Sequence, residues 1–537
     1  MALLRAILAL AVLTEVSPVP TRGINKHSQS DEDINYWAKL AKEDILDKIS
    51  QSPINKKVKN VIIVIGDGMG INTITPGRVY KGQRNGKMGE EETLALDKFP
   101  YTGLIKTYNT DHQVPDSAGT ATAILTGTKT KMGFLGIDNS VESKTCDPQK
   151  IEAAKLENIF SKAIRNKKET GIVTTTRITH ATPGAGYAAT PNRDWESDND
   201  LSEEVASAGC VEIAKQMVYN SPGKDINVLF GGGLSKFLKT NDGGVRKDED
   251  LISTWKSFKS NVSSEFLSSR RDLEGWKNKN TKYVLGLFGD SHLPYQVERD
   301  PERDPSFSDM SLAALDRLQG AYDRGESEGF VLLLESGRID QGHHENYAKK
   351  AFEEFIELDR AVKHIMEKVN LEDTLVLVTA DHSHAVTMNG YPKRGNNILG
   401  YIYEEGVGNY VTLPNGKKIP YSTISYANGP GYEDHFVNGT MVDIRNLDYE
   451  SDNYKSPSMW MGPEKYETHG GEDVAIFAAG PQSHLFTGVH EQSFITHGIL
   501  YGMCQIKDIP ASFCSSSSKL TSLSPLMVFC IIYALLK

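Results

Sequence analysis

Short apolar runs alternate with longer amphipathic segments along most of the chain. Residues 352–369 carry apolar side chains near a 3.6-residue period, with Glu and Lys between them, which predicts a helix. The apolar runs have the length of buried strands and lie at 61–65, 171–176, 227–230, 331–334, 375–379 and 474–478. Strands separated by helices predict an α/β fold, in which a large, mostly parallel central sheet is flanked by helices on both faces.

One long segment departs from this alternation. Residues 391–467 are rich in Gly, Asn, Tyr and Pro and show no clear helical period. This composition is typical of loops. We therefore expect one large domain over 23–514, with a loop-rich, crown-like subdomain inserted at about 391–467.

The two ends of the chain carry different signals. A basic residue, a short apolar stretch and small residues predict a secretory signal peptide at 1–22. At 515–537, a serine run, a polar spacer and an apolar tail fit a GPI-anchor signal that is removed, with attachment at Ser515 or Ser516. An ordinary apolar terminus is the alternative. Together the signals predict a lipid-anchored protein at the extracellular face of the plasma membrane.

The cysteines agree with secretion. One of the five, Cys530, lies in the removable tail, and the remaining even number predicts two disulfides in an oxidising compartment. Cys504 and Cys514 are close in sequence and form the first expected bridge, which leaves Cys146 with Cys210.

Composition narrows the classes of partner. The chain has 537 residues, of which 39% are apolar and 24% charged, and its formal charge is -11. This charge argues against a broad basic surface, so we expect no nucleic-acid partner. Asn261 and Asn438 stand in Asn-x-Ser/Thr sequences and are candidate glycosylation sites of a secreted glycoprotein.

Carboxylates and histidines follow several of the predicted strands. The carboxyl ends of parallel strands share one edge of a sheet, so side chains distant in sequence can converge there. Carboxylate and imidazole ligands suit zinc. The sequence therefore predicts a multi-metal site, whose candidate ligands on these segments are Asp67, Glu335, Asp340, His344, Asp381 and His382.

A serine lies among small residues at 115–123. Ser117 would begin a helix, whose first N–H groups attract an anion such as phosphate. A serine in this place is more often a helix N-cap than a nucleophile, and no Gly-x-Ser-x-Gly sequence surrounds it. The candidate metal ligands elsewhere in the chain favour the interpretation of Ser117 as a nucleophile.

Five segments resemble the signature sequences of animal alkaline phosphatases, in the same order. The similarity extends over about 37–514, and the segments are 67–70, 115–123, 335–344, 379–384 and 468–473. The resemblance implies hydrolysis of phosphate monoesters through a phosphoserine, with broad specificity and an alkaline optimum. Related metal folds that act on phosphodiesters or sulfates, or move phosphate within a sugar, are alternatives. A surface binding protein with structural zinc is another.

The resemblance also implies roles for individual residues, and two zinc ions and one magnesium ion per subunit. Ser117 matches the nucleophile, Arg193 the arginine that holds two phosphate oxygens, and His180 a histidine just outside the metal ligands. The matched ligands are Asp340, His344 and His469 for one zinc, Asp67, Asp381 and His382 for the second, and Asp67, Thr182 and Glu335 for magnesium.

A few positions depart from the family pattern, and one matches a residue that contacts the neighbouring subunit. Gln341 replaces the histidine or lysine found near the phosphate. Phe288 and Asp304 match calcium ligands of vertebrate members, but Gly289 stands where a glutamate would be, so calcium binding is expected to be weak or absent. Tyr391 matches a tyrosine that reaches into the neighbouring subunit's active site, which implies a homodimer.

Overall fold

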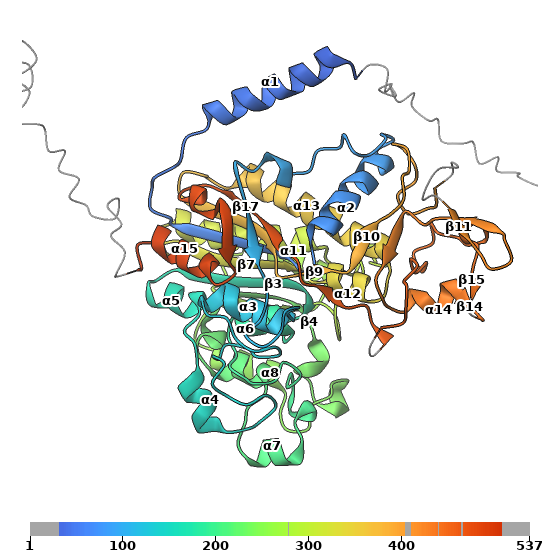
Figure 1. Ribbon diagram of the computed structural model, residues 1–537. Helices are drawn as coiled ribbons and strands as arrows, with labels where there is room; N and C mark the ends of the chain where they lie inside the picture. Colours follow the sequence, from blue (N-terminus) through green and yellow to red (C-terminus); the bar gives the residue numbers. More distant parts are fainter. Residues whose placement is uncertain (1–31, 278, 403–409, 439, 463–464, 507–537) are drawn as a thin grey trace, which may run out of the picture.

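A computed structural model describes residues 32–277, 279–402, 410–438, 440–462 and 465–506 (Figure 1). The expected signal peptide and anchor signal, with Ser515 and Ser516, lie outside these ranges. Within them, no helix has both the length and the apolar character needed to cross a membrane.

A ten-stranded sheet forms the centre of the molecule. Only β17 runs antiparallel to its neighbours in this sheet, and the other pairs are parallel. The predicted α/β fold with a mostly parallel sheet is therefore confirmed. In spatial order the strands are β18 (Gly488–Glu491), β2 (Tyr101–Lys106), β17 (Val474–Ala479), β8 (Thr374–Ala380), β1 (Asn60–Gly66), β7 (Phe330–Ser336), β3 (Glu169–Arg177), β4 (Val228–Gly232), β6 (Tyr283–Leu287) and β5 (Ser264–Leu267).

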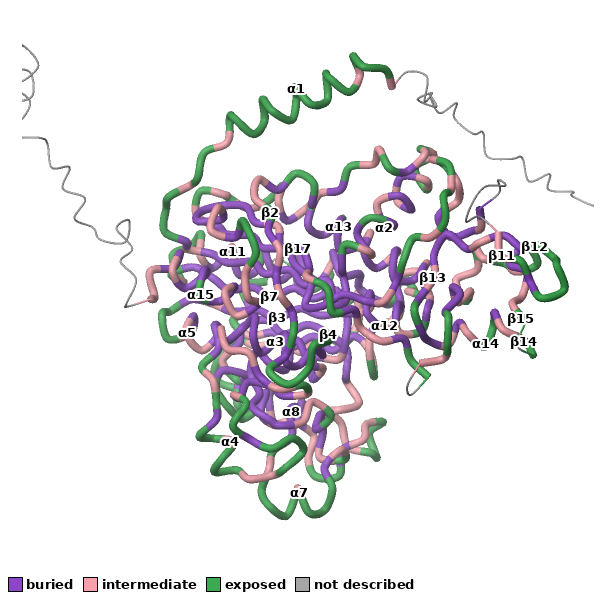
Figure 2. The backbone as a smooth tube through the Cα atoms, viewed as in Figure 1, coloured by how far each residue is buried: buried purple, intermediate pink, exposed green. Residues whose placement is uncertain are grey.

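The central strands β1, β7 and β8 are buried at every residue, as Figure 2 shows. Their sequences are continuous apolar runs because both faces of the sheet are covered. Gly171 of β3 approaches Leu318 of helix α11 (Phe307–Asp323), whereas the side chain of the next residue, Ile172, lies against Gly186 on the opposite face. Successive side chains of a strand point to opposite faces, so helices cover both sides of the sheet.

The helices are amphipathic where they meet the sheet. In α13 (Ala348–Lys368), the apolar stripe contains Phe355, whose ring packs against Gly77 of α2 (Ile71–Arg84); a Cβ there would lie 2.4 Å from the ring. The other helices are α1 (Ile34–Ser50), α3 (Ser117–Thr126), α4 (Pro148–Ala154), α5 (Ile159–Arg165), α6 (Ala181–Ala185), α7 (Glu203–Ser207), α8 (Ile213–Tyr219), α9 (Leu251–Phe258), α10 (Arg270–Trp276), α11 (Phe307–Asp323), α12 (Arg338–His344), α14 (Gly431–His435) and α15 (Phe494–Gly502).

The segment expected to be loop-rich contains short strands and α14. It lies to one side of the sheet in Figure 1. Within it, β11 (Tyr410–Thr412) pairs with β12 (Lys418–Pro420) and β14 (Phe436–Val437) with β15 (Thr440–Met441), while β13 (Ile424–Tyr426) pairs with β10 (Val386–Met388), which lies just before the segment. One further pair, β9 (Ser383–His384) with β16 (His469–Gly470), brings this segment's end back to the sheet.

Two features concern the periphery. Helix α1 stands apart from the sheet and contains no buried residue (Figures 1 and 2). The Cys146–Cys210 disulfide is present, with a Cα–Cα distance of 5.9 Å. Cys504 is also disulfide-bonded, and its expected partner Cys514 lies outside the described residues.

Candidate active site

The candidate ligands meet at the carboxyl edge of the sheet. Asp67 follows β1, Glu335 is the second-last residue of β7, and Asp381 and His382 follow β8. The short β9–β16 pair sets His469 opposite His384. The fold thus brings together residues as far apart in the sequence as Asp67 and His469, which are 402 positions apart.

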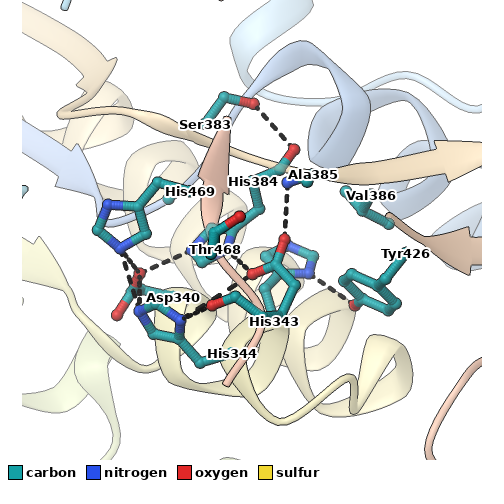
Figure 3. Close-up of polar contacts among 12 residues, drawn as sticks. Asp340, His343, His344, Ser383, His384, Ala385, Val386, Tyr426, Thr468 and His469 are labelled. Carbon is teal, nitrogen blue, oxygen red and sulfur yellow. Dashed lines mark hydrogen bonds and ion pairs between the residues drawn. The ribbon is translucent and has the colours of Figure 1, made fainter. Parts of the chain in front are cut away.

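The first group of side chains surrounds Asp340, as Figure 3 shows. Its Oδ1 atom lies 3.3 Å from Nε2 of His344, 3.3 Å from Nε2 of His469 and 2.7 Å from Nε2 of His384. The Nδ1–H group of His344 can donate to the Glu467 carbonyl at 2.6 Å, and that of His469 to the Pro115 carbonyl at 2.7 Å. Such bonds leave Nε2 of each ring free for a metal, which is the usual arrangement of histidine ligands.

The second group lies around His382, whose Nε2 atom is 3.5 Å from Asp67 Oδ1 and 3.3 Å from Asp381 Oδ2. Asp381 is fixed by the Gly68 N–H group at 3.0 Å. Ser117 Oγ lies 3.1 Å from His382 Nε2. The residues predicted to bind the second zinc therefore lie together, and His382 among them contacts the predicted nucleophile.

The third group consists of Asp67, His180 and Glu335, which lie close enough to share an ion. Glu335 Oε2 accepts a hydrogen bond from the Thr174 hydroxyl. Thr182 Oγ1 is buried and has no hydrogen-bond partner within the described chain. His180 lies within ligand distance of Asp67 and Glu335, and its place just outside the magnesium ligands stays a prediction.

The chemistry of the three groups fits cations. Both carboxylate oxygens of Asp67 and Oε1 of Glu335 are buried without a hydrogen-bond partner among the described residues. Burial, and then Asp340 and Asp381, raise the pKa of Asp67 well above its ordinary value. Burial likewise raises the pKa of Glu335 to about 7. Buried carboxylates that repel one another are stabilised by a shared metal ion.

Ser117 opens α3, and the residue before it caps the helix. Asp116 Oδ1 accepts the Gly119 N–H group at 3.1 Å, so Ser117 itself is free of the capping role. Asp116 Oδ2 accepts Arg193 NH1 at 3.0 Å, and Arg193 NH2 lies 3.0 Å from His180 Nε2. Burial opposes ionisation of Asp116, but Arg193 and two backbone N–H groups hold its pKa below the ordinary value. The guanidinium is thus oriented from both sides.

A cavity of about 630 Å³ opens on this edge of the sheet. Its walls include His344 and His469, and its rim includes the apolar side chains of Val114, Met132 and Tyr466. The Arg193 side chain is 22% exposed, so it can contact a ligand.

Other expected residues lie away from the cavity. Tyr391 is 76% exposed, and Asn261 and Asn438 are exposed as glycosylation would require. The Asp304 carboxylate accepts bonds from Arg303 Nε at 2.9 Å and from the Asp300 N–H group at 3.1 Å. Both of its oxygens therefore already accept hydrogen bonds from protein donors, and weak or absent calcium binding stays a prediction.

Sequence reasoning gave no role to three residues of the site. His384 lies between Asp340 and Glu467, with Nδ1 at 2.5 Å from Glu467 Oε2. Burial opposes its charge, but Glu467 and Asp340 raise the pKa of His384 to about 10. The signature segments at 379–384 and 115–123 contained His384 and Asp116, whereas no sequence signal marked Glu467.

Comparison with known proteins agrees with this geometry. The family description "Alkaline phosphatase" matches residues 58–505. The chain is 40% identical to the human tissue-nonspecific alkaline phosphatase isozyme, over 94% of this chain and 95% of that one. It is 36% identical to a membrane-bound alkaline phosphatase of Bombyx mori, over 89% and 86% of the two chains. The alkaline phosphatase structure from Thermus thermophilus shares the fold, with a TM-score of 0.58, 21% identity, and 86% and 94% coverage.

These matches extend over most of the chain and define a class of hydrolytic enzyme. The chain belongs to the alkaline phosphatase family, whose members hydrolyse phosphate monoesters. The predicted family and enzyme class are confirmed.

Proposed function

We propose that the protein hydrolyses a broad range of phosphate monoesters through a phosphoserine at Ser117, with an alkaline optimum. The observation that carries this proposal is the placement of Ser117 Oγ at a helix N-terminus, 3.1 Å from His382 Nε2 and beside buried carboxylate oxygens that lack partners. Arg193 would hold two phosphate oxygens through its planar guanidinium.

The reaction would be two in-line displacements. Ser117 Oγ forms a bond to phosphorus as the ester P–O bond breaks, and the proton lost by the serine hydroxyl is balanced by the one that the departing alkoxide takes as it leaves as the alcohol. A water oxygen then attacks the phosphoserine, the bond between phosphorus and Ser117 Oγ breaks, and one proton of the water passes to the serine oxygen as inorganic phosphate is released. Arg193 and the first N–H groups of α3 balance the charge of the equatorial oxygens in both steps.

We assign the ligands of the bound ions as the resemblance implies. Asp340, His344 and His469 would hold one zinc ion, and Asp67, Asp381 and His382 the other. Asp67, Thr182 and Glu335 would hold magnesium. When bound, these cations supply Lewis acidity, which lowers the pKa of the serine hydroxyl and stabilises the leaving group.

Release of p-nitrophenol from p-nitrophenyl phosphate tests the proposal between pH 7 and 10. Activity should disappear with a chelator, return on addition of zinc and magnesium, and be lost in Ser117→Ala. Wild-type turnover in Ser117→Ala would contradict the phosphoserine route.

The assembly we propose is a GPI-anchored homodimer at the extracellular face of the plasma membrane. The isolated position of α1 supports a dimer, because a second subunit would cover its exposed apolar residues Ile34, Trp37 and Ile49. Tyr391 would reach the partner subunit. Light scattering on wild type and on a chain lacking residues 32–50 tests the dimer, and release from cells by phosphatidylinositol-specific phospholipase C tests the anchor.

A further inference from the structure

A histidine outside the predicted site contacts a residue inside it. His292 lies in the loop after β6, and its ring stands edge to face against His180, with centroids 5.3 Å apart and planes at 81°. His180 Nε2 lies 3.0 Å from Arg193 NH2. A chain of contacts therefore runs from His292 to the arginine proposed to bind phosphate.

The backbone around His292 is fastened to the sheet. The Leu293 N–H group donates to the Thr175 carbonyl of β3 at 3.0 Å, and the Gly233 N–H group donates to the Ser291 carbonyl at 2.8 Å. A Cβ on Gly232 would lie 2.0 Å from the Ser291 carbonyl oxygen, so this close approach requires glycine. The loop thus holds His292 at a fixed distance from the end of β3.

The His292 ring is also held by donors on two other segments. Arg177 NH1 lies 2.6 Å from Nε2, and Gln341 Nε2 lies 3.1 Å from the same atom. Gln341 is itself fixed because its Oε1 atom accepts a bond from Arg338. Burial, and then Arg177 and Arg338, lower the pKa of His292 to about 2, so the ring is neutral.

Among the residues that the structure describes, none gives His180 a second hydrogen bond that would set the plane of its ring. Its Nδ1 atom is buried without a partner in the described part of the chain. The edge-to-face contact with His292 therefore constrains the ring. Asp116 fixes only the NH1 side of Arg193, whereas His180 contacts NH2.

We infer that His292 is a positioning residue for phosphate binding. Its ring orients His180, and through His180 the guanidinium of Arg193. Gln341, which stands where the family has histidine or lysine, acts in this chain by holding His292. The inference rests on the proposed function, because it concerns the same phosphate site.

The test is the affinity of the zinc- and magnesium-loaded protein for inorganic phosphate, measured by calorimetric titration. His292→Ala should weaken phosphate binding about fivefold, the range expected for loss of an edge-to-face contact. His292→Phe keeps a ring against His180 and should change the affinity less than about twofold. His484→Ala is the matched control, since His484 is a half-buried histidine in edge-to-face contact with Tyr101. It should leave the affinity unchanged.

Several results of these measurements would overturn the inference. Wild-type phosphate affinity in His292→Ala would overturn the inference, as would an equal loss in the His484→Ala control. Loss of metal from His292→Ala, with affinity restored on metal addition, would place its role at the metal and also overturn it. If His292→Ala does not fold, His292→Leu replaces it, and equal affinities in the Leu and Phe variants would overturn the inference. Absence of p-nitrophenyl phosphate turnover in the wild type would instead contradict the proposed function.

Discussion

The buried carboxylates make a specific prediction for the metal-free protein. Glu335 has an ordinary pKa of 4.5, which burial raises to about 7 in the folded chain. The folded state then binds the proton more tightly than the unfolded state, so stability is greatest below pH 4.5 and falls as the pH rises through 7. With about 1.4 kcal/mol for each pH unit between the two values, Glu335 lowers the unfolding free energy by about 3 kcal/mol.

The prediction is checked by thermal unfolding of chelator-treated protein between pH 5 and 8, at one heating rate. The melting temperature should fall by a few degrees with rising pH, and Glu335→Gln should make this fall shallower. Adding zinc and magnesium should also make the fall of the melting temperature with pH shallower, because cations stabilise the ionised carboxylate.

A second buried glutamate provides the matched control. Burial also raises the pKa of Glu354 to about 7, but Glu354 lies in α13 and accepts the Gln296 N–H group at 2.6 Å. Glu354→Gln should therefore make the pH dependence shallower both with and without metals, whereas Glu335→Gln should act only without them. A metal-free Glu335→Gln protein whose melting temperature falls as steeply as that of wild type would refute the reasoning.

Three further predictions concern metals and stability. His384→Ala removes the 2.7 Å partner of Asp340 and should weaken zinc binding about 10- to 100-fold, measured by competition with a chelating dye; unchanged affinity would exclude a supporting role. The Cys146–Cys210 bridge spans 64 positions, so replacing both residues by Ser should cost about 2–4 kcal/mol of stability and lower the melting temperature, with kcat retained. Calcium should not raise the melting temperature, since Asp304 is already hydrogen-bonded; a clear rise would show a calcium site.

The strands and helices with strong patterns could be predicted from the sequence, and the peripheral ones could not. The apolar run at 331–334 lies inside β7, and the amphipathic pattern at 352–369 lies almost entirely in α13. The strands β2, β5, β6 and β18 were not predicted. β5 has four residues and β2 alternates buried with partly exposed positions, so neither gives a continuous apolar run. Their pairing is decided by neighbouring strands rather than by local composition.

The candidate site shows the same division between local and tertiary information. Residues such as Asp67 and His382 are ligand types placed directly after strong strands, so sequence alone could indicate them. Asp116, His384 and His292 act through contacts with residues far away in the chain, and Arg177 and Gln341, which hold His292, lie 115 and 49 positions from it. Only the folded loops create such contacts.

The orientation of Arg193 shows why this difference matters for function. Its two sides are fixed by residues on separate segments: Asp116 caps α3, and His180 precedes α6. Asp116 also fixes Ser117 by capping the helix that begins there, so the proposed nucleophile and the Arg193 guanidinium are both held by Asp116. Preorganised groups of this kind accelerate a reaction because they need little rearrangement as charge develops. A substitution that leaves Ser117 and every candidate metal ligand intact can therefore still reduce phosphate binding, if it weakens the contacts that Asp116 and His180 make with Arg193.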